Sequence, residues 1–460
     1  MEVNHHDITI IGAGVSSIFF AYTLINENPD ISIHMIDVGK ELENRHCGID
    51  EGKECTCGDT CSKYTGFSGL GKSEGKFNYT NDFGGELHRK IGKERALRLM
   101  EEVDAILCKF GGSVREKYST KNEALSKKAR RHGLHALSTE VRHLGTDLSQ
   151  KIFQNMYEFM QDRMTFSFET KVETIRKNEK GFELHTNQEK VHTNTIVVGT
   201  GMSGSIWLKK MMESLSVYPG ETRLDMGCRV EMKENQLKAI LQDTFETKLK
   251  IQCRNYEGTT YCMNPRGRII RKHQHGLVMP DGQNVYEKET PSANLNFTLF
   301  VPQYFSSYED AMNRAVEIIG SINRGKDRVV VQRLTDFKRG IRTEALVGNE
   351  VVPSLNADIG NVRKEIPKLY SQALLDFLFA LENLLGEEIH GDTLIYGLDA
   401  KFYEPKLFTD KFLESEVKGI YLIGDCSGVT HSLSQAAASG IYLGKHLALL
   451  PGENNLRGYR

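Results

Sequence analysis

The sequence lacks the features that mark membrane-spanning, secreted and strongly charged proteins. It has no stretch of about eighteen or more apolar residues, so neither a membrane-spanning helix nor a membrane partner is expected. Its first residues are acidic and histidine-bearing, without the basic segment and cleavage site of a secretory signal. The net charge of −2 gives no reason to expect nucleic acid as the main partner. These absences predict a cytoplasmic location.

The chain is long, with 460 residues, of which 39% are hydrophobic and 26% are charged. This composition is that of an ordinary globular protein, and the length predicts two or three domains. Nine cysteines in a cytoplasmic chain are expected to be reduced thiols, metal ligands or core residues rather than a disulfide framework.

The N-terminal segment carries a glycine pattern that is typical of dinucleotide-binding folds. Residues 7–11 read as a buried strand that leads into a glycine turn and then a buried helix. Gly12 permits the tight turn, Gly14 lets the backbone approach a pyrophosphate, and Ser17 is small enough for the helix to pack on the strand. A second strand ends at Asp37, whose carboxylate can accept hydrogen bonds from an adenosine ribose. This ordered combination predicts a dinucleotide site at the helix N-terminus.

A second motif lies near the C-terminus. Residues 419–423 read as a strand that leads into Gly424 and Asp425, and Gly428 follows before a helix of small residues. This segment resembles the second flavin motif of the glutathione-reductase-like flavoproteins. The resemblance implies that Asp425 meets the ribityl or pyrophosphate part of FAD, and that the following helix points its N-terminus at the isoalloxazine. Because both ends of the chain then build one site, the sequence favours FAD over NAD as the cofactor.

A third glycine pattern, at residues 199–204, allows two interpretations. One is a second, NAD(P)-binding fold. The other is a strand that returns the chain to the FAD domain, because residues 164–172 and 181–186 before it alternate like strands of a β-meander. No strand ending in an acidic residue follows about twenty residues later, so we favour the return strand. This interpretation adds the following residues to the predicted FAD-binding set: Val172, Gly199, Thr200 and Gly201.

Several further segments form a combination that extends over nearly the whole chain. They are residues 66–77, 142–147, 224–231, 261–267, 294–297 and 401–403, together with the Gly424-Asp425 motif. In these segments the chain is similar to a widespread but poorly characterised family of bacterial and archaeal FAD-dependent dehydrogenases. The resemblance implies FAD and redox chemistry and does not name a substrate.

Four cysteines gather in a loop at residues 45–62, and we name them the cysteine cluster: Cys47, Cys55, Cys57 and Cys61. Four thiolates within reach of one centre suit zinc or an iron–sulfur cluster. No pair has the spacing of a standard zinc ribbon, so the two metals stay equally open. The alternatives are reduced thiols in a loop, or redox pairing of Cys55 with Cys57 or Cys61.

Three residues are candidates for catalysis. Lys76 follows the glycine-rich segment 66–75, which is expected to cross the flavin, and its ammonium would stabilise an anionic reduced ring; a solvated lysine is the alternative. His143 and Asp147 share one face if their segment is a helix, as an acid/base pair or as structural residues. Cys262 is the third candidate, approaching the flavin from the substrate domain. A lone cysteine is more often a core residue, and the place of Cys262 in a family-like segment is what makes the functional role an alternative.

These motifs predict an α/β fold: a Rossmann-like FAD-binding domain, with a parallel sheet and a β-meander, interrupted by an α+β substrate or cap domain. The FAD-binding domain is expected at residues 1–215 and 385–460, and the inserted domain at 216–384. The leading hypothesis is an oxidoreductase that transfers a hydride between a small organic substrate and flavin N5. Its electron partner would be transient NAD(P)H, a ferredoxin-like protein or oxygen. The alternatives are an RNA-modifying flavoenzyme and a non-catalytic, redox-sensing flavoprotein whose cysteine cluster binds metal.

Overall fold

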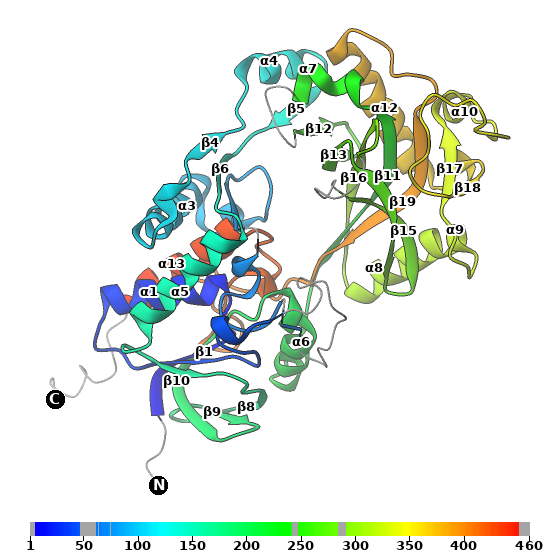
Figure 1. Cartoon of the computed structure of the whole chain (residues 1–460). Coiled ribbons are helices and arrows are strands. Elements are labelled where there is room, and N and C mark those ends of the chain that lie inside the picture. The colour runs from blue at the N-terminus through cyan, green and yellow to red at the C-terminus, as the bar shows by residue number, and fades with distance from the viewer. Residues whose placement is uncertain are drawn as a thin grey trace. The chain divides into compact units, whose positions relative to one another are not determined.

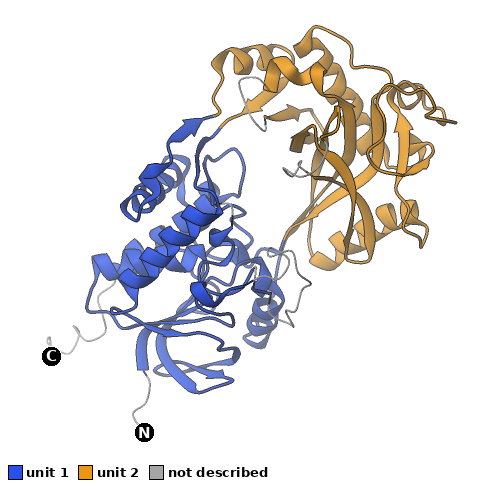
Figure 2. Ribbon diagram, in the orientation of Figure 1, with its two compact units in different colours: residues 1–119, 139–220, 404–460 blue, residues 120–138, 221–403 orange. Residues whose placement is uncertain are grey.

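The computed structural model describes residues 5–46, 61–62, 64–73, 75–241, 247–283 and 291–449. The chain forms two compact units, which Figure 2 shows in blue and orange. Unit 1 comprises Met1–Ser119, Thr139–Gly220 and Glu404–Arg460, and unit 2 comprises Thr120–Ser138 and Glu221–Tyr403. Each unit has its own sheet and its own hydrophobic core.

Unit 1 is built on a seven-stranded sheet that contains a parallel half. The parallel strands stand in the order β7, β2, β1, β10 and β20. They are β1 (His5–Ile11), β2 (Ile33–Ile36), β7 (Thr165–Ser167), β10 (Lys190–Val198) and β20 (Ile420–Leu422). Their isoleucines and valines are buried, as expected for a parallel sheet that is covered on both faces. The order of the strands is that of a Rossmann-like fold.

Strand β10 joins the parallel half of the sheet to an antiparallel β-meander. Its first residues pair with β9 (Gly181–Thr186), which pairs in turn with β8 (Val172–Asn178). Its last residues, Ile196–Val198, pair in parallel with β20. The strand before Gly199 therefore belongs to the same sheet as β1 and does not open a second nucleotide fold. The parallel sheet and the meander confirm the fold class predicted for this part of the chain.

Helices α1 (Val15–Glu27) and α13 (Leu433–Ala448) bring segments from the two ends of the chain side by side (Figure 1). Glycines permit this contact, because a Cβ on Gly440 would lie 2.1 Å from the carbonyl oxygen of Ser16. Helices α3 (Lys93–Lys109) and α5 (Thr146–Met160) add to the same apolar core. The smaller elements of unit 1 are η1 (Leu42–Asn44), η2 (Gly69–Lys72), α2 (Leu87–Ile91), η3 (Gly112–Val114), η4 (Met202–Gly204), α6 (Ser205–Ser214), η7 (Asp425–Ser427) and the small sheet of β3 (Lys76–Tyr79), β6 (Glu140–His143) and β4 (Lys117–Ser119).

Unit 2 has an eight-stranded sheet that is antiparallel except for one edge pair. The strand order is β18, β17, β19, β11, β16, β13, β12 and β5, and β17 runs parallel to β18. The strands are β5 (Leu134–Leu137), β11 (Thr222–Lys233), β12 (Lys248–Gln252), β13 (Glu257–Pro265), β16 (Asn294–Phe305), β17 (Val330–Arg333), β18 (Asp358–Ile359) and β19 (Leu394–Phe402), and a separate hairpin pairs β14 (Arg268–Gln274) with β15 (Leu277–Gln283). This α+β unit agrees with the class predicted for the inserted domain.

Unit 2 also contains several helices, and α12 contributes many side chains to the hydrophobic core of the unit. These helices are α4 (Glu123–Arg131), α7 (Lys238–Leu241), α8 (Tyr308–Ala315), α9 (Ser321–Asn323), α10 (Leu334–Arg339), α11 (Val362–Glu365) and α12 (Lys368–Leu385), with the short turns η5 (Glu234–Leu237) and η6 (Val316–Gly320). Within the described ranges of the whole chain, no helix is both long enough and apolar enough to cross a membrane.

The borders of the two units differ from the predicted domain borders. Strand β19 lies in unit 2 rather than in the part predicted to bind FAD, because it pairs along its length with β11 and also with β17. Residues 120–138 also belong to unit 2, because β5 pairs with β12 and α4 packs on β5. Both associations join segments that lie far apart in the sequence, and local periodicity does not reveal them.

Two of the family-like segments meet in a buried polar cluster of unit 2. Arg229 on β11 is fully buried and donates to Thr298 Oγ1 at 2.9 Å and to Asn296, both on β16. Asp399 on β19 accepts hydrogen bonds from Thr298 at 3.1 Å and from Lys272 at 2.6 Å. Burial raises the pKa of Asp399, while the charges of Lys272 and Arg229 act against that rise. The cluster links three neighbouring strands through polar side chains.

Candidate cofactor site

The predicted cofactor residues gather at one edge of the unit 1 sheet. Gly12 follows the last residue of β1, and Asp37 follows the last residue of β2. Gly199 follows β10, and Gly424 comes shortly after β20. Because these strands run parallel, all four segments emerge at the carboxyl edge, where open α/β sheets bind nucleotides. The fold therefore brings together four separate stretches of the sequence.

The turn after β1 contains two glycines with different roles. Gly12 has a φ of +97°, and a Cβ there would lie 2.7 Å from the carbonyl oxygen of Gly199. The backbone conformation and the contact with the end of β10 both require glycine at this position. Gly14 has an ordinary φ of −75°, and a Cβ there would come no closer than 3.5 Å to the described part of the protein. The fold itself therefore tolerates a side chain at Gly14, and a ligand approaching that backbone would not.

Helix α1 begins at this turn without a side-chain cap. Gly14 is its N-cap residue, and its first turn contains no acidic residue. The first amides of a helix have no intrahelical acceptor, and they carry the positive end of the helix dipole. These amides and the positive end of the dipole suit a bound phosphate group. Ser17, in the first turn of the helix, is fully buried beside Gly199, where its small side chain lets α1 pack on β10.

Asp37 is held in place by backbone amides. Ala13 N donates to Oδ2 and Gly39 N donates to Oδ1, each at 2.7 Å. Burial raises the pKa of the Asp37 carboxyl, and these two amides together with the charge of Arg45 act in the opposite direction. The carboxylate also accepts from the backbone amide of Gly66, and its remaining acceptor capacity can receive a ligand hydroxyl.

A glycine loop, residues 66–72, lies beside the dinucleotide turn. Ser68 forms a parallel bridge with Gly14, and its amide donates to the carbonyl of Ala13 at 2.8 Å. The sequence placed this loop near the cofactor through its glycines. The sequence did not indicate that two cations at this loop, Arg45 and Lys72, are buried; these residues are only 4% and 7% exposed. A lone arginine after a strand is normally a surface residue, so only the fold identifies it as a site residue.

The second motif is also fixed by local geometry. Gly424 has a φ of +69°, and a Cβ there would lie 2.5 Å from the hydroxyl oxygen of Ser16. Asp425 accepts a hydrogen bond from Thr430 Oγ1 at 2.7 Å, which orients its carboxylate. Gly428 ends the short turn η7 with a φ of +70°. The motif thus packs directly on the first turn of α1.

Two further residues predicted to bind the cofactor are Val172, at the start of β8, and Thr200, just after the end of β10. Val172 begins β8, is buried, and its carbonyl accepts a hydrogen bond from Trp207 Nε1 at 2.7 Å. This hydrogen bond occupies one of the two acceptor positions of the Val172 carbonyl, and Val172 is one of the residues predicted to bind the cofactor. Thr200 has a side-chain hydrogen bond with Cys426, and Gly201 after it has a φ of +61°.

Lys76 and His143 are neighbours, although the expected helical face does not form. They stand directly opposite each other in the antiparallel pair of β3 and β6. His143 ends β6 and is exposed, whereas Asp147 lies in the first turn of α5. The prediction that one helix carries both residues is wrong, because Gly145 between them has a φ of +77° and is the N-cap of α5. Cys262 lies in β13 of unit 2, and its side chain is outside the described part of the structure.

Most of the cysteine cluster lies outside the described residues: Cys47, Cys55 and Cys57. Cys61 is described and is a partly buried free thiol. In the described part of the chain, no group of three or more histidine, cysteine, aspartate or glutamate side chains is arranged to hold a metal ion. The metal site therefore stays a prediction.

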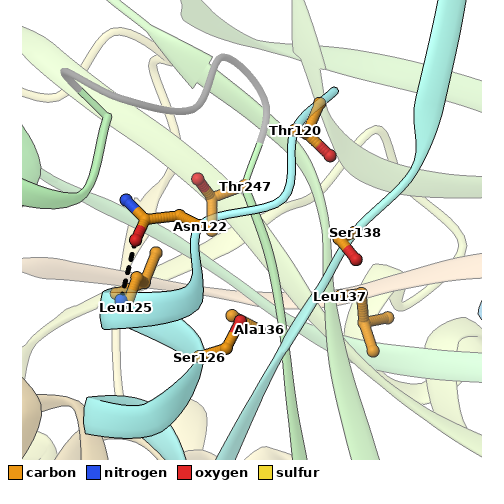
Figure 3. Close-up of a pocket in the computed structure, with 8 residues that line it drawn as sticks. All are labelled: Thr120, Asn122, Leu125, Ser126, Ala136, Leu137, Ser138 and Thr247. Atoms are coloured by element: carbon orange, nitrogen blue, oxygen red, sulfur yellow. Dashed lines mark hydrogen bonds between the residues drawn. The ribbon is translucent and has the colours of Figure 1, made fainter. Parts of the chain in front are cut away.

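A small pocket in unit 2 has no evident chemistry (Figure 3). It is lined by Thr120, Asn122, Leu125, Ser126, Ala136, Leu137, Ser138 and Thr247. The Asn122 side chain accepts from the amide of Leu125 at 2.8 Å and so caps α4. No lining residue carries a charge, so the carboxyl edge of unit 1 remains the better candidate site.

Comparisons with known proteins give only distant likenesses. No family model matches the chain, and no curated protein matches it. Among solved structures, glycine oxidase from Geobacillus kaustophilus is 10% identical, with a TM-score of 0.36 and coverage of 97% of this chain and 94% of that one. A variant of the quinol fumarate reductase FrdA from E. coli is 12% identical, with a TM-score of 0.40, over 100% of this chain and 73% of that one. PqsL from P. aeruginosa, in complex with 2-aminobenzoylacetate, is 11% identical, with a TM-score of 0.37 and coverage of 97% and 85%. Likeness at this level carries no argument about the site.

Proposed function

We propose that this chain is an FAD-dependent oxidoreductase that transfers a hydride between flavin N5 and a small organic substrate. The observation that carries the proposal is the convergence at one sheet edge of the glycine turn, Asp37 and the Gly424-Asp425 motif. A single nucleotide fingerprint suits many ligands, whereas contributions from both ends of the chain suit a cofactor as long as FAD.

The residues of this edge fit the cofactor. Gly14 leaves open space beside the backbone, and the uncapped N-terminus of α1 supplies amide donors for a diphosphate. Asp37 has acceptor positions for ribose hydroxyls at the adenosine end. Asp425, oriented by Thr430, stands at the start of η7 for the hydroxyls of the ribityl chain.

When bound, FAD supplies the hydride chemistry, and the protein supplies binding, orientation and exclusion of competing reactions. Lys76 and His143, paired across β3 and β6, are the titratable side chains that we propose for charge stabilisation and proton transfer. Cys262 remains a third candidate. A nicotinamide cofactor or a small electron-carrying protein would complete the electron balance.

The first test asks whether the purified protein contains FAD and whether Asp37 binds the adenosine part of that cofactor. Purified protein is extracted, and the released flavin is identified by chromatography as FAD or FMN. The Asp37→Ala variant is expected to bind FAD about tenfold or more weakly, because a buried acceptor for the ribose is lost. FMN has no adenosine, so the variant should bind FMN as the wild type does. Asp30→Ala, at an exposed aspartate before β2, is the matched control and should leave both affinities unchanged.

The second test addresses the redox activity. Anaerobic addition of NADH, NADPH or a reduced ferredoxin should bleach the visible flavin band of the wild type. A chain that retains no flavin would contradict the binding proposal. A flavin-loaded chain that no donor reduces would contradict the oxidoreductase proposal while leaving the binding site intact.

A further inference from the structure

We infer that Arg45 is a positioning residue, which holds the glycine loop against the dinucleotide turn and thereby sets the affinity of the site for FAD. This inference rests on the proposed function and adds a residue to which no motif assigned a role. Arg45 lies directly after η1, between the acidic end of β2 and the cysteine cluster. Its side chain turns inward instead of reaching the solvent.

The contacts of Arg45 are mainly with backbone carbonyls that follow it in the chain. Nη1 donates to the carbonyls of Phe67 at 2.5 Å and Gly69 at 3.0 Å, and Nε donates to the carbonyl of Ser62 at 3.1 Å. The carbonyl of Arg45 itself accepts from the ammonium of Lys72 at 3.0 Å. The two ends of the glycine loop are therefore both tied to this one residue.

The loop needs such a tie because its backbone conformation is unfavourable. Gly66, Ser68 and Gly69 have φ values of +102°, +69° and +50°. Ser68 is not a glycine and is fully buried, so its left-handed conformation must be imposed by its surroundings. The two carbonyls that accept from Arg45 Nη1, those of Phe67 and Gly69, flank Ser68 in the chain. Without Arg45, the buried carbonyl of Phe67 would lose this donor and the partly buried carbonyl of Gly69 would lose a second contact, and the loop would relax.

The position of the loop matters because it adjoins both halves of the nucleotide turn. Ser68 bridges to Gly14, where we expect the diphosphate, and the charge of Arg45 acts on Asp37, where we expect the ribose. A shift of the loop would therefore move the wall of the site beside Gly14. Arginine suits this task better than lysine, because its planar guanidinium carries five donors in a fixed geometry, whereas an ammonium is a point charge.

The test compares Arg45→Lys with Arg45→Gln. FAD affinity is measured by titration of the flavin-stripped protein, and hydrogen–deuterium exchange is measured for peptides covering residues 64–73. Both variants are expected to raise the Kd for FAD by about 10- to 100-fold and to speed exchange in this segment, because neither keeps the fork of donors. Adding Ser68→Gly to Arg45→Lys should recover part of the affinity, since glycine adopts the left-handed conformation without strain.

Arg142 provides a matched control in the same unit. It is also buried, and it also donates to backbone carbonyls, those of Gly112 and Arg115. Arg142→Lys should lower the melting temperature while leaving the Kd for FAD and the exchange of residues 64–73 unchanged. An equal loss of FAD affinity in this variant would overturn the inference, because any destabilised variant would then behave alike.

The remaining outcomes are equally decisive. Wild-type affinity in Arg45→Lys would mean that the charge alone matters, and wild-type exchange in both variants would mean that Arg45 does not position the loop. Either result overturns the inference and leaves the proposed function standing. A wild-type chain that binds no FAD overturns the proposed function, and the inference falls with it.

Discussion

The two glycines of the dinucleotide turn give the sharpest test of how the site is built. Gly12 and Gly14 are two positions apart, yet the structure gives them opposite reasons for being glycine. At Gly12 a Cβ meets the backbone of Gly199 at 2.7 Å in a left-handed conformation, so the fold excludes a side chain. At Gly14 the space is open, so only a ligand would exclude one. Gly12→Ala and Gly14→Ala should therefore damage different properties.

The expected magnitudes follow from these contacts. Gly12→Ala costs about 1–2 kcal/mol for the left-handed conformation. The backbone overlap adds about 1–3 kcal/mol more. A total of about 2–5 kcal/mol lowers the melting temperature of the flavin-free protein by roughly 5–15 °C. Gly14→Ala should stay within about 0.5 kcal/mol of the wild type in folding. It should nevertheless weaken FAD binding by about 10- to 100-fold, because a methyl group stands where the diphosphate approaches.

The assay uses flavin-stripped protein for both measurements. Scanning calorimetry gives the melting temperature, and quenching of flavin fluorescence gives the Kd for FAD. If Gly14→Ala melts as low as Gly12→Ala, then Gly14 is a structural residue and its distinction from Gly12 is wrong. The reasoning is also refuted if Gly14→Val, with a larger side chain, binds FAD as tightly as the wild type.

Three further predictions concern other parts of the chain. Gly440→Leu should destabilise the protein by about 3 kcal/mol or more in chemical denaturation, because its side chain would force α13 away from α1; a smaller loss would show that the helices can separate. Burial opposes ionisation of Asp104, but hydrogen bonds from Arg142 and Tyr79 outweigh it and lower the pKa of that carboxyl. The stabilisation is therefore present above about pH 4 and lost as the pH falls further, and Asp104→Asn should flatten this dependence in melts from about pH 7 to about pH 3. Protein purified without oxygen should contain zinc or iron that is lost when the cysteine cluster is changed to serine, and metal-free wild-type protein would contradict that site.

The sequence by itself determined the parts of the site that depend on local pattern. Gly12, Gly14 and Asp37 are recognisable because a short buried strand, a glycine turn and a helix follow one another without interruption. The same holds for Gly424 and Asp425 at the end of β20. Each of these patterns reflects backbone requirements within a few residues, and parallel strands then place them at one edge.

Tertiary structure decided what depends on segments that are distant in the chain. Nothing near residues 120–138 indicates that β5 will pair with β12, more than a hundred residues further along the chain, because strand pairing is a property of two segments at once. The helical face suggested for His143 and Asp147 failed through the conformation of Gly145, which spacing alone does not show. The role inferred for Arg45 is of the same kind. Its partners are backbone carbonyls, which every sequence contains, so only the folded loop shows which of them it binds.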